Sequence, residues 1–210
     1  MRAPALLAWA GLLACGGARS SMLAAPSILP EVSHHDATWG AERTPLALSA
    51  GAASSCADYA RLESSGIRDE TPNMIVAREY RICDVLAQMG QDVEVKPLTE
   101  GGSYGEALAT RLDLRSFGSS LGPRLEDDRY TLTSLFDPSQ LDIKSHGVAV
   151  GTSDWSYVLR VVLVGDIDRD GSVDWVVWLD DEARQGSYRA YQTLIIRGAS
   201  GAGLLRASAP

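Results

Sequence analysis

The last third of the chain contains three dense apolar runs separated by polar or glycine-containing turns. They read SYVLRVVLVGD, DWVVWL and YQTLIIRG, and their many β-branched residues favour strands over helices. Because the connections between them are only about ten residues long, the simplest arrangement is an antiparallel meander. The first two runs are almost continuously apolar, so we expect those strands at the centre of a sheet with both faces covered.

A short helix is predicted where the folded part of the chain is expected to begin. In SSCADYARLESSG, Ser55 is a candidate N-cap and Gly66 is a candidate stop. The helix is therefore expected over residues 57–63, directly after Cys56.

A second, longer helix is predicted in TPNMIVAREYRICDVLAQMG. Thr71 is its candidate N-cap, Pro72 occupies the first helical position, and Gly90 follows its end. Its apolar positions recur at near-helical spacing, namely Ile75, Val76, Ile82, Cys83, Leu86 and Met89. We expect this apolar face to pack on one side of the sheet.

The region between this helix and the apolar runs has weaker patterns. DVEVKPL alternates apolar and charged residues and predicts a strand that stops at Pro97. RYTLTSLF, residues 129–136, alternates in a similar way and predicts another strand. EALATRLDLRSF, residues 106–117, fits a helix at its start or a strand around Leu112, and periodicity leaves both alternatives open.

Together these elements predict an α+β fold. N-terminal helices pack on an antiparallel sheet that ends in a C-terminal β-meander, which gives two layers. Residues 56–210 are expected to form this single domain, and an apolar fraction of 45% is enough for a sizeable core.

The start of the chain has the composition of an export signal. Arg2 precedes an apolar run over residues 3–13, which is too short to span a bilayer. The motif LLAC, which ends at Cys15, resembles the lipobox of bacterial lipoproteins. The resemblance implies a signal peptide over residues 1–14 and a lipid anchor on Cys15, and Gly16 in place of an aspartate implies the outer membrane. The alternative is an ordinary secretory signal and a secreted protein.

Residues 15–55 are rich in Ala, Ser, Gly and Pro and lack sustained apolar periodicity. Such a segment buries too little apolar surface to offset its ordering entropy, so it predicts a flexible tether between membrane and domain. His34, His35 and Asp36 lie within it and are potential metal ligands. Neighbouring histidines in a polar tail are more often simply solvated.

The formal net charge of −8 argues against nucleic acid as a partner. Proteins that bind nucleic acid need clustered Lys and Arg against the phosphates. We therefore expect no nucleic-acid partner.

With Cys15 assigned to the anchor, Cys56 and Cys83 remain as an even pair in a chain expected to reach an oxidising compartment. A disulfide between them is the simplest interpretation, and it would join the two predicted helices. By restricting the unfolded chain it would stabilise the fold by roughly 3 kcal/mol. No CxxC motif indicates a zinc site, and the two positions do not indicate a nucleophilic cysteine.

An acidic loop, GDIDRDGSVD, lies between the first two apolar runs. Its spacing supplies side-chain oxygens at positions 1, 3, 5 and 9 of an EF-hand type of calcium loop, a glycine at position 6 and a backbone carbonyl at position 7. The residues are Asp166, Asp168, Asp170, Gly171, Ser172 and Asp174. Position 12, a bidentate glutamate in EF-hands, is Val177, and the flanking segments predict strands instead of helices.

The segment VLVGDIDRDGSVDWVVWL resembles the strand-flanked DxDxDG calcium loops of FG-GAP and VCBS-type repeat proteins. The resemblance implies one calcium ion bound by the four aspartates and by the carbonyl of Ser172. Those families build propellers from tandem copies, whereas this chain has a single DxDxDG, so a propeller is not expected. Further oxygen ligands could come from water or from Asp154, Asp180 or Asp181.

Two alternatives to a metal site are open for the acidic loop. The first is an exposed acidic turn without a metal. Neighbouring carboxylates repel one another by roughly 1 to a few kcal/mol per pair, and in such a turn Arg169 instead of a bound cation would reduce this cost. A catalytic role needs carboxylates held across a cleft, which the sequence does not indicate. VVLVGDIDRDG also resembles the DxD motif of haloacid-dehalogenase phosphotransferases, but Asp170 and Gly171 replace the residues that this family has there.

Three tryptophans, Trp155, Trp175 and Trp178, lie close to the acidic loop along the chain. If they were exposed together, they could bind a glycan or a protein. Trp175 and Trp178 are three positions apart in a predicted strand and face opposite sides, so at least one is expected in the core.

The sequence therefore predicts a secreted, lipid-anchored envelope protein with one structural calcium ion, acting as a non-catalytic structural or recognition module. An envelope hydrolase that uses the acidic cluster is the alternative, although no GxSxG, HExxH, P-loop or GxGxxG motif indicates an enzyme class. The expected partners are the membrane, through the anchor, and a glycan or protein ligand.

Overall fold

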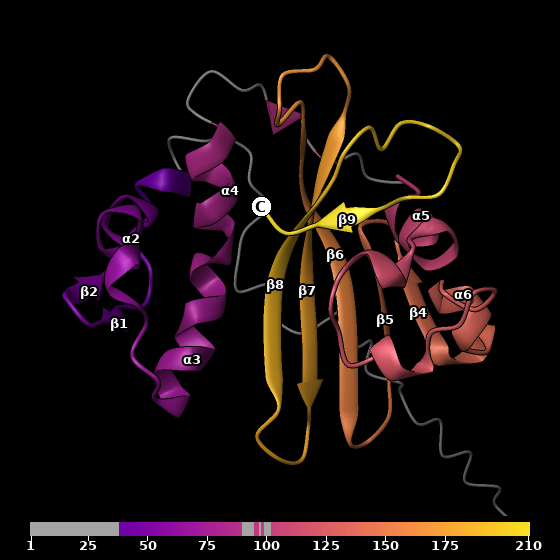
Figure 1. The fold of residues 1–210 in the computed structure, drawn as a ribbon, viewed down its shortest axis with the longest axis horizontal. Helices are drawn as coiled ribbons and strands as arrows, with labels where there is room; N and C mark the ends of the chain where they lie inside the picture. Colours follow the sequence, from indigo (N-terminus) through magenta and orange to yellow (C-terminus); the bar gives the residue numbers. More distant parts are fainter. Residues whose placement is uncertain (1–37, 90–94, 97, 99–101) are drawn as a thin grey trace, which may run out of the picture.

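The computed structural model describes residues 38–89, 95–96, 98 and 102–210 (Figure 1). The predicted signal peptide, Cys15 and residues 34–36 lie outside the described residues. Among the described residues, no helix is both long and apolar enough to cross a membrane.

In the described part of the chain, seven strands with antiparallel pairing form the central sheet. Six lie side by side in sequence order: β4 (Leu141–Lys144), β5 (Gly147–Gly151), β6 (Trp155–Gly165), β7 (Asp174–Ala183), β8 (Arg189–Ile196) and β9 (Ala207–Ser208). The short β3 (Val95–Lys96) pairs with the C-terminal end of β6. The three apolar runs thus form β6, β7 and β8, and the predicted C-terminal meander is present. The sheet continues beyond it with β5 and β4 on one side and β9 on the other.

Both faces of β6 and β7 are buried, as their nearly continuous apolar sequences predict. Val176 packs in the core on one face of the sheet, and Val177 packs in the core on the other face. The pairing of the two strands shifts register at a β-bulge, where Val162 is the extra residue of β6. These strands therefore divide the interior into two cores.

Trp175 and Trp178 belong to these opposite cores. They are only 8% and 9% exposed, so the two rings do not form an exposed platform. Trp155 is half-buried at the start of β6.

A helical layer and a small second sheet cover the first face (Figure 1). Its elements are β1 (Leu46–Leu48), β2 (Gly51–Ala53), α2 (Cys56–Leu62), η2 (Glu63–Ser65), α3 (Thr71–Ala77), η3 (Arg78–Tyr80) and α4 (Arg81–Met89). The amphipathic α4 buries Ile82, Leu86 and Met89 against this core. The expected packing of N-terminal helices on one side of the sheet is observed.

Short helices cover the second face as well. They are α5 (Tyr104–Arg111), η4 (Leu114–Ser116), η5 (Gly122–Arg124), α6 (Leu132–Leu135) and η6 (Pro138–Gln140). Leu108 of α5 and Leu132 of α6 are fully buried against the sheet. The sheet thus has helices on both faces, and the expectation of two layers is corrected to three.

The predicted tether over residues 15–55 does not extend to residue 55. β1 and β2 form an antiparallel hairpin, and Leu46, Leu48 and Ala53 are fully buried. The hydroxyl of Tyr80 lies 2.8 and 2.7 Å from the carbonyl oxygens of Thr44 and Ala53, which share its single donor proton, and this contact ties the segment to the helices. Strands of three residues are too short to produce a visible hydrophobic period, so the sequence pattern missed them.

The two predicted N-terminal helices are present, and the second differs from the prediction in two ways. Ser55 caps α2 by accepting a hydrogen bond from the backbone N–H of Asp58, as predicted. The second helix is interrupted, because η3 separates α3 from α4, and its N-cap is Glu70 where Thr71 was expected. Gly90, the predicted stop, lies outside the described residues.

The predicted strand over residues 129–136 is wrong. This segment contains the helix α6, which begins with a capping box in which Thr131 and Ser134 bond reciprocally. Local capping bonds therefore override the alternation of apolar residues, which is a weak signal over so few positions. In the stretch left open at residues 106–117, α5 continues to Arg111 and the short η4 follows.

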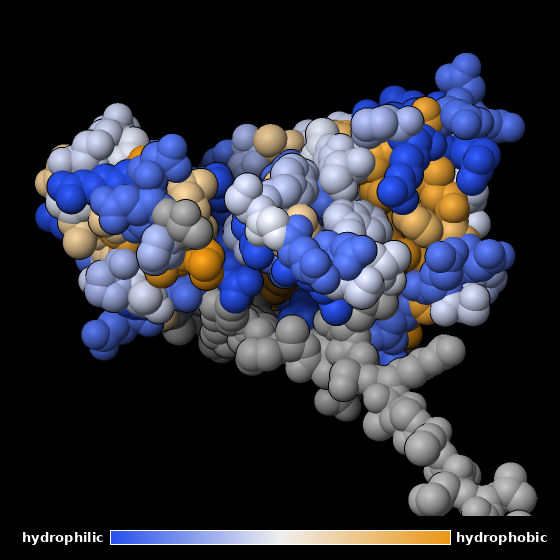
Figure 2. Space-filling model, turned by 90° about the horizontal axis from the view of Figure 1, so that it is seen from below, coloured by the Kyte–Doolittle hydropathy of each residue, from blue (hydrophilic) through white to orange (hydrophobic). Residues whose placement is uncertain are grey.

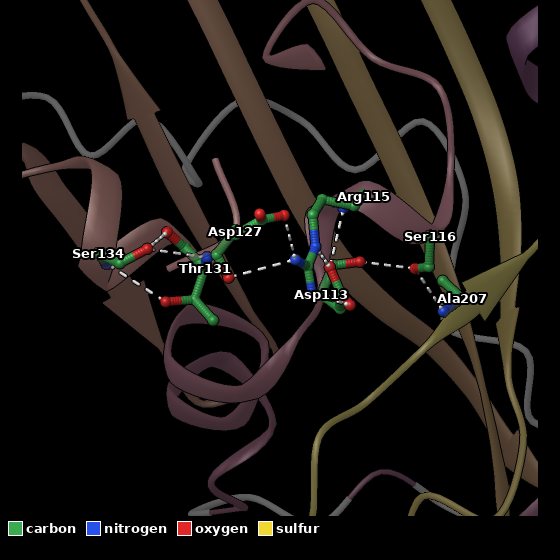
Figure 3. A network of polar contacts seen from close by, with 7 residues as sticks. All are labelled: Asp113, Arg115, Ser116, Asp127, Thr131, Ser134 and Ala207. Atoms are coloured by element: carbon green, nitrogen blue, oxygen red, sulfur yellow. Dashed lines mark hydrogen bonds and ion pairs between the residues drawn. The ribbon is translucent and has the colours of Figure 1, made fainter. Parts of the chain in front are cut away.

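Polar contacts hold the segment between α5 and α6 (Figure 3). The carboxylate of Asp113 accepts hydrogen bonds from the guanidinium of Arg115 at 2.8 and 2.9 Å, and these bonds hold the pKa of Asp113 below its usual range. Ser116 Oγ donates to the carbonyl of Asp113 and accepts from the backbone N–H of Ala207 in β9. The network fixes η4 against the end of the sheet.

Figure 2 shows the surface of the molecule from below the view of Figure 1. This face is mostly hydrophilic, with hydrophobic residues in smaller separate areas.

Candidate metal centre

The acidic loop connects β6 to β7, the two most extensively paired strands of the sheet. Gly165 at the end of β6 pairs with Asp174 at the start of β7, so residues 166–173 form the tip of a hairpin. Because both strands are anchored in two cores, the ends of the loop have fixed positions.

The first aspartate organises the turn. Asp166 accepts hydrogen bonds from the backbone N–H groups of Asp170 and Gly171, at 3.0 and 2.9 Å. Arg169 and Gly171 have φ values of 63° and 87°, in the left-handed region. Glycine adopts this conformation without steric cost, which explains its place at the sharpest point of the loop.

The last aspartate is fully buried and joins the loop to a distant segment. Asp174 Oδ2 accepts from the backbone N–H of Ile167 at 2.9 Å, and Oδ1 accepts from the backbone N–H of Gly198 at 2.9 Å. Gly198 follows β8, so this carboxylate links the β6–β7 loop to the β8–β9 connection. Asp174 is a structural residue whether or not it also binds an ion.

Three of the four predicted aspartate ligands come together. Asp166, Asp168 and Asp174 each offer a carboxylate oxygen, and these oxygens lie within 4.8 Å of one another. Oxygens that bind one calcium ion at its usual distances lie no more than about 5 Å apart. The spacing therefore fits three ligands of one cation.

Asp170 and Ser172 are not part of this trio. Asp170 Oδ1 accepts a hydrogen bond from the backbone N–H of Ser172 at 2.7 Å. Asp170 is exposed, and Ser172 is partly buried. Their assignment as ligands stays a prediction.

The cation that pairs with the loop is not the one that the sequence suggested. Arg197 Nε lies 3.0 Å from Asp168 Oδ2 and forms an ion pair with it. Arg169, inside the loop, instead donates to the carbonyl of Met89 at 3.4 Å. Arg197 was not identified from the sequence because it lies 29 residues away from Asp168 along the chain.

The additional acidic ligands considered from the sequence lie at the opposite end of the hairpin. Asp154 directly precedes β6, and Asp180 and Asp181 of β7 pair with the first residues of that strand. The acidic loop follows Gly165, at the other end of β6. Asp180 accepts from Trp178 Nε1, and burial raises its pKa. The suggestion that Asp154, Asp180 or Asp181 completes the loop site is therefore wrong.

Asp181 is the centre of a polar network that sequence reasoning missed. Its fully buried carboxylate accepts hydrogen bonds from four donors: Ser120 N at 2.7 Å, Ser120 Oγ at 2.6 Å, Trp155 Nε1 at 3.1 Å and Tyr188 O–H at 3.1 Å. The donors come from three separate segments. This aspartate joins β6, β7, the β7–β8 turn and the η5 segment.

The disulfide prediction is confirmed. Cys56 and Cys83 are bonded, and both are buried in the core of the first face. The bond links α2 to α4. Cys15, the predicted lipidation site, lies outside the described residues.

Comparison with known proteins gave no relative: no family model, no curated protein and no solved structure matches this chain. Conclusions about function therefore depend on the residues and their arrangement.

Proposed function

We propose that the β6–β7 loop binds one calcium ion with a structural role, in a secreted α+β domain that a lipid anchor on Cys15 holds at the outer membrane. The observation that supports the calcium site most directly is the meeting of three carboxylate oxygens within 4.8 Å. The described residues contain no other such group of His, Cys, Asp or Glu.

The chemistry of the donors favours calcium. The loop offers carboxylate and carbonyl oxygens, which are hard ligands suited to calcium and magnesium, and it offers no histidine or cysteine. Calcium accepts irregular arrangements of six to eight oxygens, whereas magnesium demands a near-ideal octahedron. A loop that offers aspartate side chains, a backbone carbonyl and room for water suits calcium better.

Two of the ligands are held in position without an ion. Asp166 and Asp174 each accept two backbone hydrogen bonds, so their carboxylates would lose little conformational freedom on binding. Asp168 is exposed and pairs with Arg197, and binding would exchange this ion pair for the metal. Asp170 and the carbonyl of Ser172 are the proposed remaining protein ligands.

A structural role follows from the position of the loop. Asp174 already connects the β6–β7 hairpin to the β8–β9 connection through Gly198. An ion that binds Asp174 together with the tip of the loop would strengthen this connection. Binding only to the folded state stabilises a protein in proportion to the occupancy of the site.

We expect calcium to raise the thermal unfolding midpoint and Asp168→Ala to abolish this rise. At about 100 times the dissociation constant, calcium should add about 2.7 kcal/mol, or roughly 5–10 °C. Asp168 is the suitable position because it is exposed and makes a surface ion pair, so its removal should cost the metal-free protein less than about 1 kcal/mol. Differential scanning calorimetry with calcium, magnesium or a chelator measures these shifts.

Two further variants make the calcium experiment specific. Asp128→Asn removes an exposed carboxylate outside the loop and should keep the full calcium response. Arg197→Ala removes the cation that competes for Asp168, and calcium affinity should increase. Identical midpoints of the wild type in calcium and in chelator would refute the site. Hydrolytic activity that disappears with Asp168→Ala would instead favour the hydrolase alternative.

The proposed lipid anchor has its own test. Cys15→Ser removes the thiol that the lipobox resemblance assigns to acylation. We expect the variant to move from the membrane fraction to the soluble fraction of cells that export it, because a single chemical attachment holds the domain. Membrane retention equal to that of the wild type would contradict the anchor and leave the calcium proposal unaffected.

A further inference from the structure

A cleft of about 500 Å³ lies between α4 and β8, and none of its lining residues belongs to the acidic loop. Ala209 and Pro210 also line it, and in Figure 1 this C-terminal end of the chain lies between α4 and β9. Sites for small ligands usually have volumes of about 300–1,000 Å³. The residues of its lining that matter here are Glu63, Arg81, Asp84, Gln88, Tyr191 and Thr193.

The sheet side of the cleft carries a buried hydroxyl without a partner. Thr193 is 4% exposed, and its Oγ1 has no hydrogen-bond partner among the described residues. Its neighbour on the same face of β8, Ile195, belongs to the core of the first face. A valine would fill the same space without leaving a buried polar group unpaired, so the hydroxyl at this position calls for an explanation outside the fold itself.

The helix side of the cleft carries charges of both signs. Arg81 and Asp84 are three residues apart on α4, so their side chains leave the helix on the same face. The Nε atom of Arg81 is buried and has no hydrogen-bond partner among the described residues. Glu63 adds a second carboxylate to the lining.

Asp84 is in an environment that favours an additional positive charge. Burial and the charge of Glu63 raise the pKa of its carboxyl group, and the charge of Arg81 and a hydrogen bond with Tyr59 act in the opposite direction. A ligand ammonium beside Asp84 would act in the same direction as Arg81 and offset the desolvation of the carboxylate. The cleft thus offers acceptors for a cation next to donors for an anion.

We propose that this cleft binds a free α-amino acid as its zwitterion, with the ligand carboxylate facing Arg81 and Thr193 and the ligand ammonium facing Asp84 and Glu63. The ammonium and the carboxylate of an α-amino acid are attached to the same carbon atom. Arg81 and Asp84 likewise lie on the same face of α4, so opposite charges are close together in the ligand and in the cleft. Electrostatic complementarity of this kind selects a zwitterion over an ion of one sign. The remaining volume, bordered by Tyr191, accommodates the ligand side chain.

The first experiment uses the purified protein and the twenty common L-amino acids as probes, with isothermal titration calorimetry as the readout. We expect at least one to bind in the micromolar to millimolar range. Its N-acetyl and carboxamide derivatives, which lack the ammonium and the carboxylate respectively, should each bind at least tenfold more weakly. No binding of any amino acid at millimolar concentration, or a derivative that binds as tightly as the free amino acid, would overturn the proposal.

The second experiment separates ligand binding from stability. Thr193→Val should weaken binding at least tenfold while leaving the unfolding midpoint of the ligand-free protein equal or higher. Asp84→Asn should also weaken binding at least tenfold, and the exposed Asp128→Asn should not change it. A lower midpoint for Thr193→Val would show that the hydroxyl serves the fold, and wild-type affinity in both cleft variants would show that the cleft is not the binding site. Either result would overturn the proposal. Calcium and chelator should give the same amino-acid affinity, because no cleft residue belongs to the acidic loop.

Discussion

Replacing Asp181 with alanine is expected to lower the free energy of unfolding by about 3–5 kcal/mol, which corresponds to a fall of about 10 °C in the midpoint. The carboxylate is fully buried and accepts four hydrogen bonds. Its removal takes the acceptor from the backbone N–H and the hydroxyl of Ser120 and leaves Trp155 Nε1 with only the 3.2 Å bond to Ser120 Oγ, and each buried donor left unpaired costs about 1–3 kcal/mol. Chemical denaturation followed by tryptophan fluorescence measures this loss.

Two companion variants make the result specific to the carboxylate. Asp181→Asn keeps the volume of the side chain but turns one acceptor into a donor, so we expect a loss close to that of alanine. Asp154→Ala removes an exposed carboxylate nearby and should change stability by less than about 1 kcal/mol. An Asp181→Ala protein as stable as the wild type would show that the network does not contribute to the fold.

Removing the disulfide is expected to produce the second large effect. The double variant Cys56→Ala and Cys83→Ala should lose about 3–4 kcal/mol, because the bond closes a loop with a sequence separation of 27 and restricts the unfolded chain. The two cysteines are also buried between α2 and α4, so the contact between these helices should weaken first. Thermal unfolding in the presence and absence of a reductant measures the loss.

The response to reductant provides the control for this experiment. The wild type should become as unstable as the double variant when it is reduced, and the double variant should not respond. A reductant-insensitive wild type would mean that the bond does not form in the isolated protein. Calcium should stabilise oxidised and reduced protein equally, because the bond and the acidic loop have no residues in common.

The central strands could be predicted from the sequence because their signal is local and strong. β6 and β7 are long, apolar and β-branched, and such segments have few alternatives to the middle of a sheet. The cap at Ser55 and the Cys56–Cys83 pair were predictable for the same reason. In each case the deciding residues are close in sequence or restricted in number.

The shorter elements could not be predicted because their energetics depend on distant partners. The hairpin of β1 and β2 has three residues in each strand, and it is stabilised by burial against the helices and by Tyr80. At α6, the capping box of Thr131 and Ser134 decided between helix and strand, where apolar alternation indicated the wrong answer. The second helical layer was missed because its helices are too short to show a clear period.

The candidate metal site shows the same division. Spacing alone identified Asp166, Asp168 and Asp174, because a loop between two strands brings alternate residues to one side of a turn. The bond from Gly198 to Asp174 and the ion pair of Arg197 join residues that are 24 and 29 positions apart, and no local pattern records them.

The sequence by itself therefore determined the central strands, the disulfide pair and the chemistry of the acidic loop, since each depends on residue type and short-range spacing. The tertiary structure decided that Asp170 bonds to the backbone N–H of Ser172 and is not part of the aspartate trio, that Asp181 joins three segments, and that Thr193 lines a cleft against α4. Burial and pairing between distant segments follow from how the layers pack, and hydrophobic periodicity along the chain contains no information about which side chains meet across that packing.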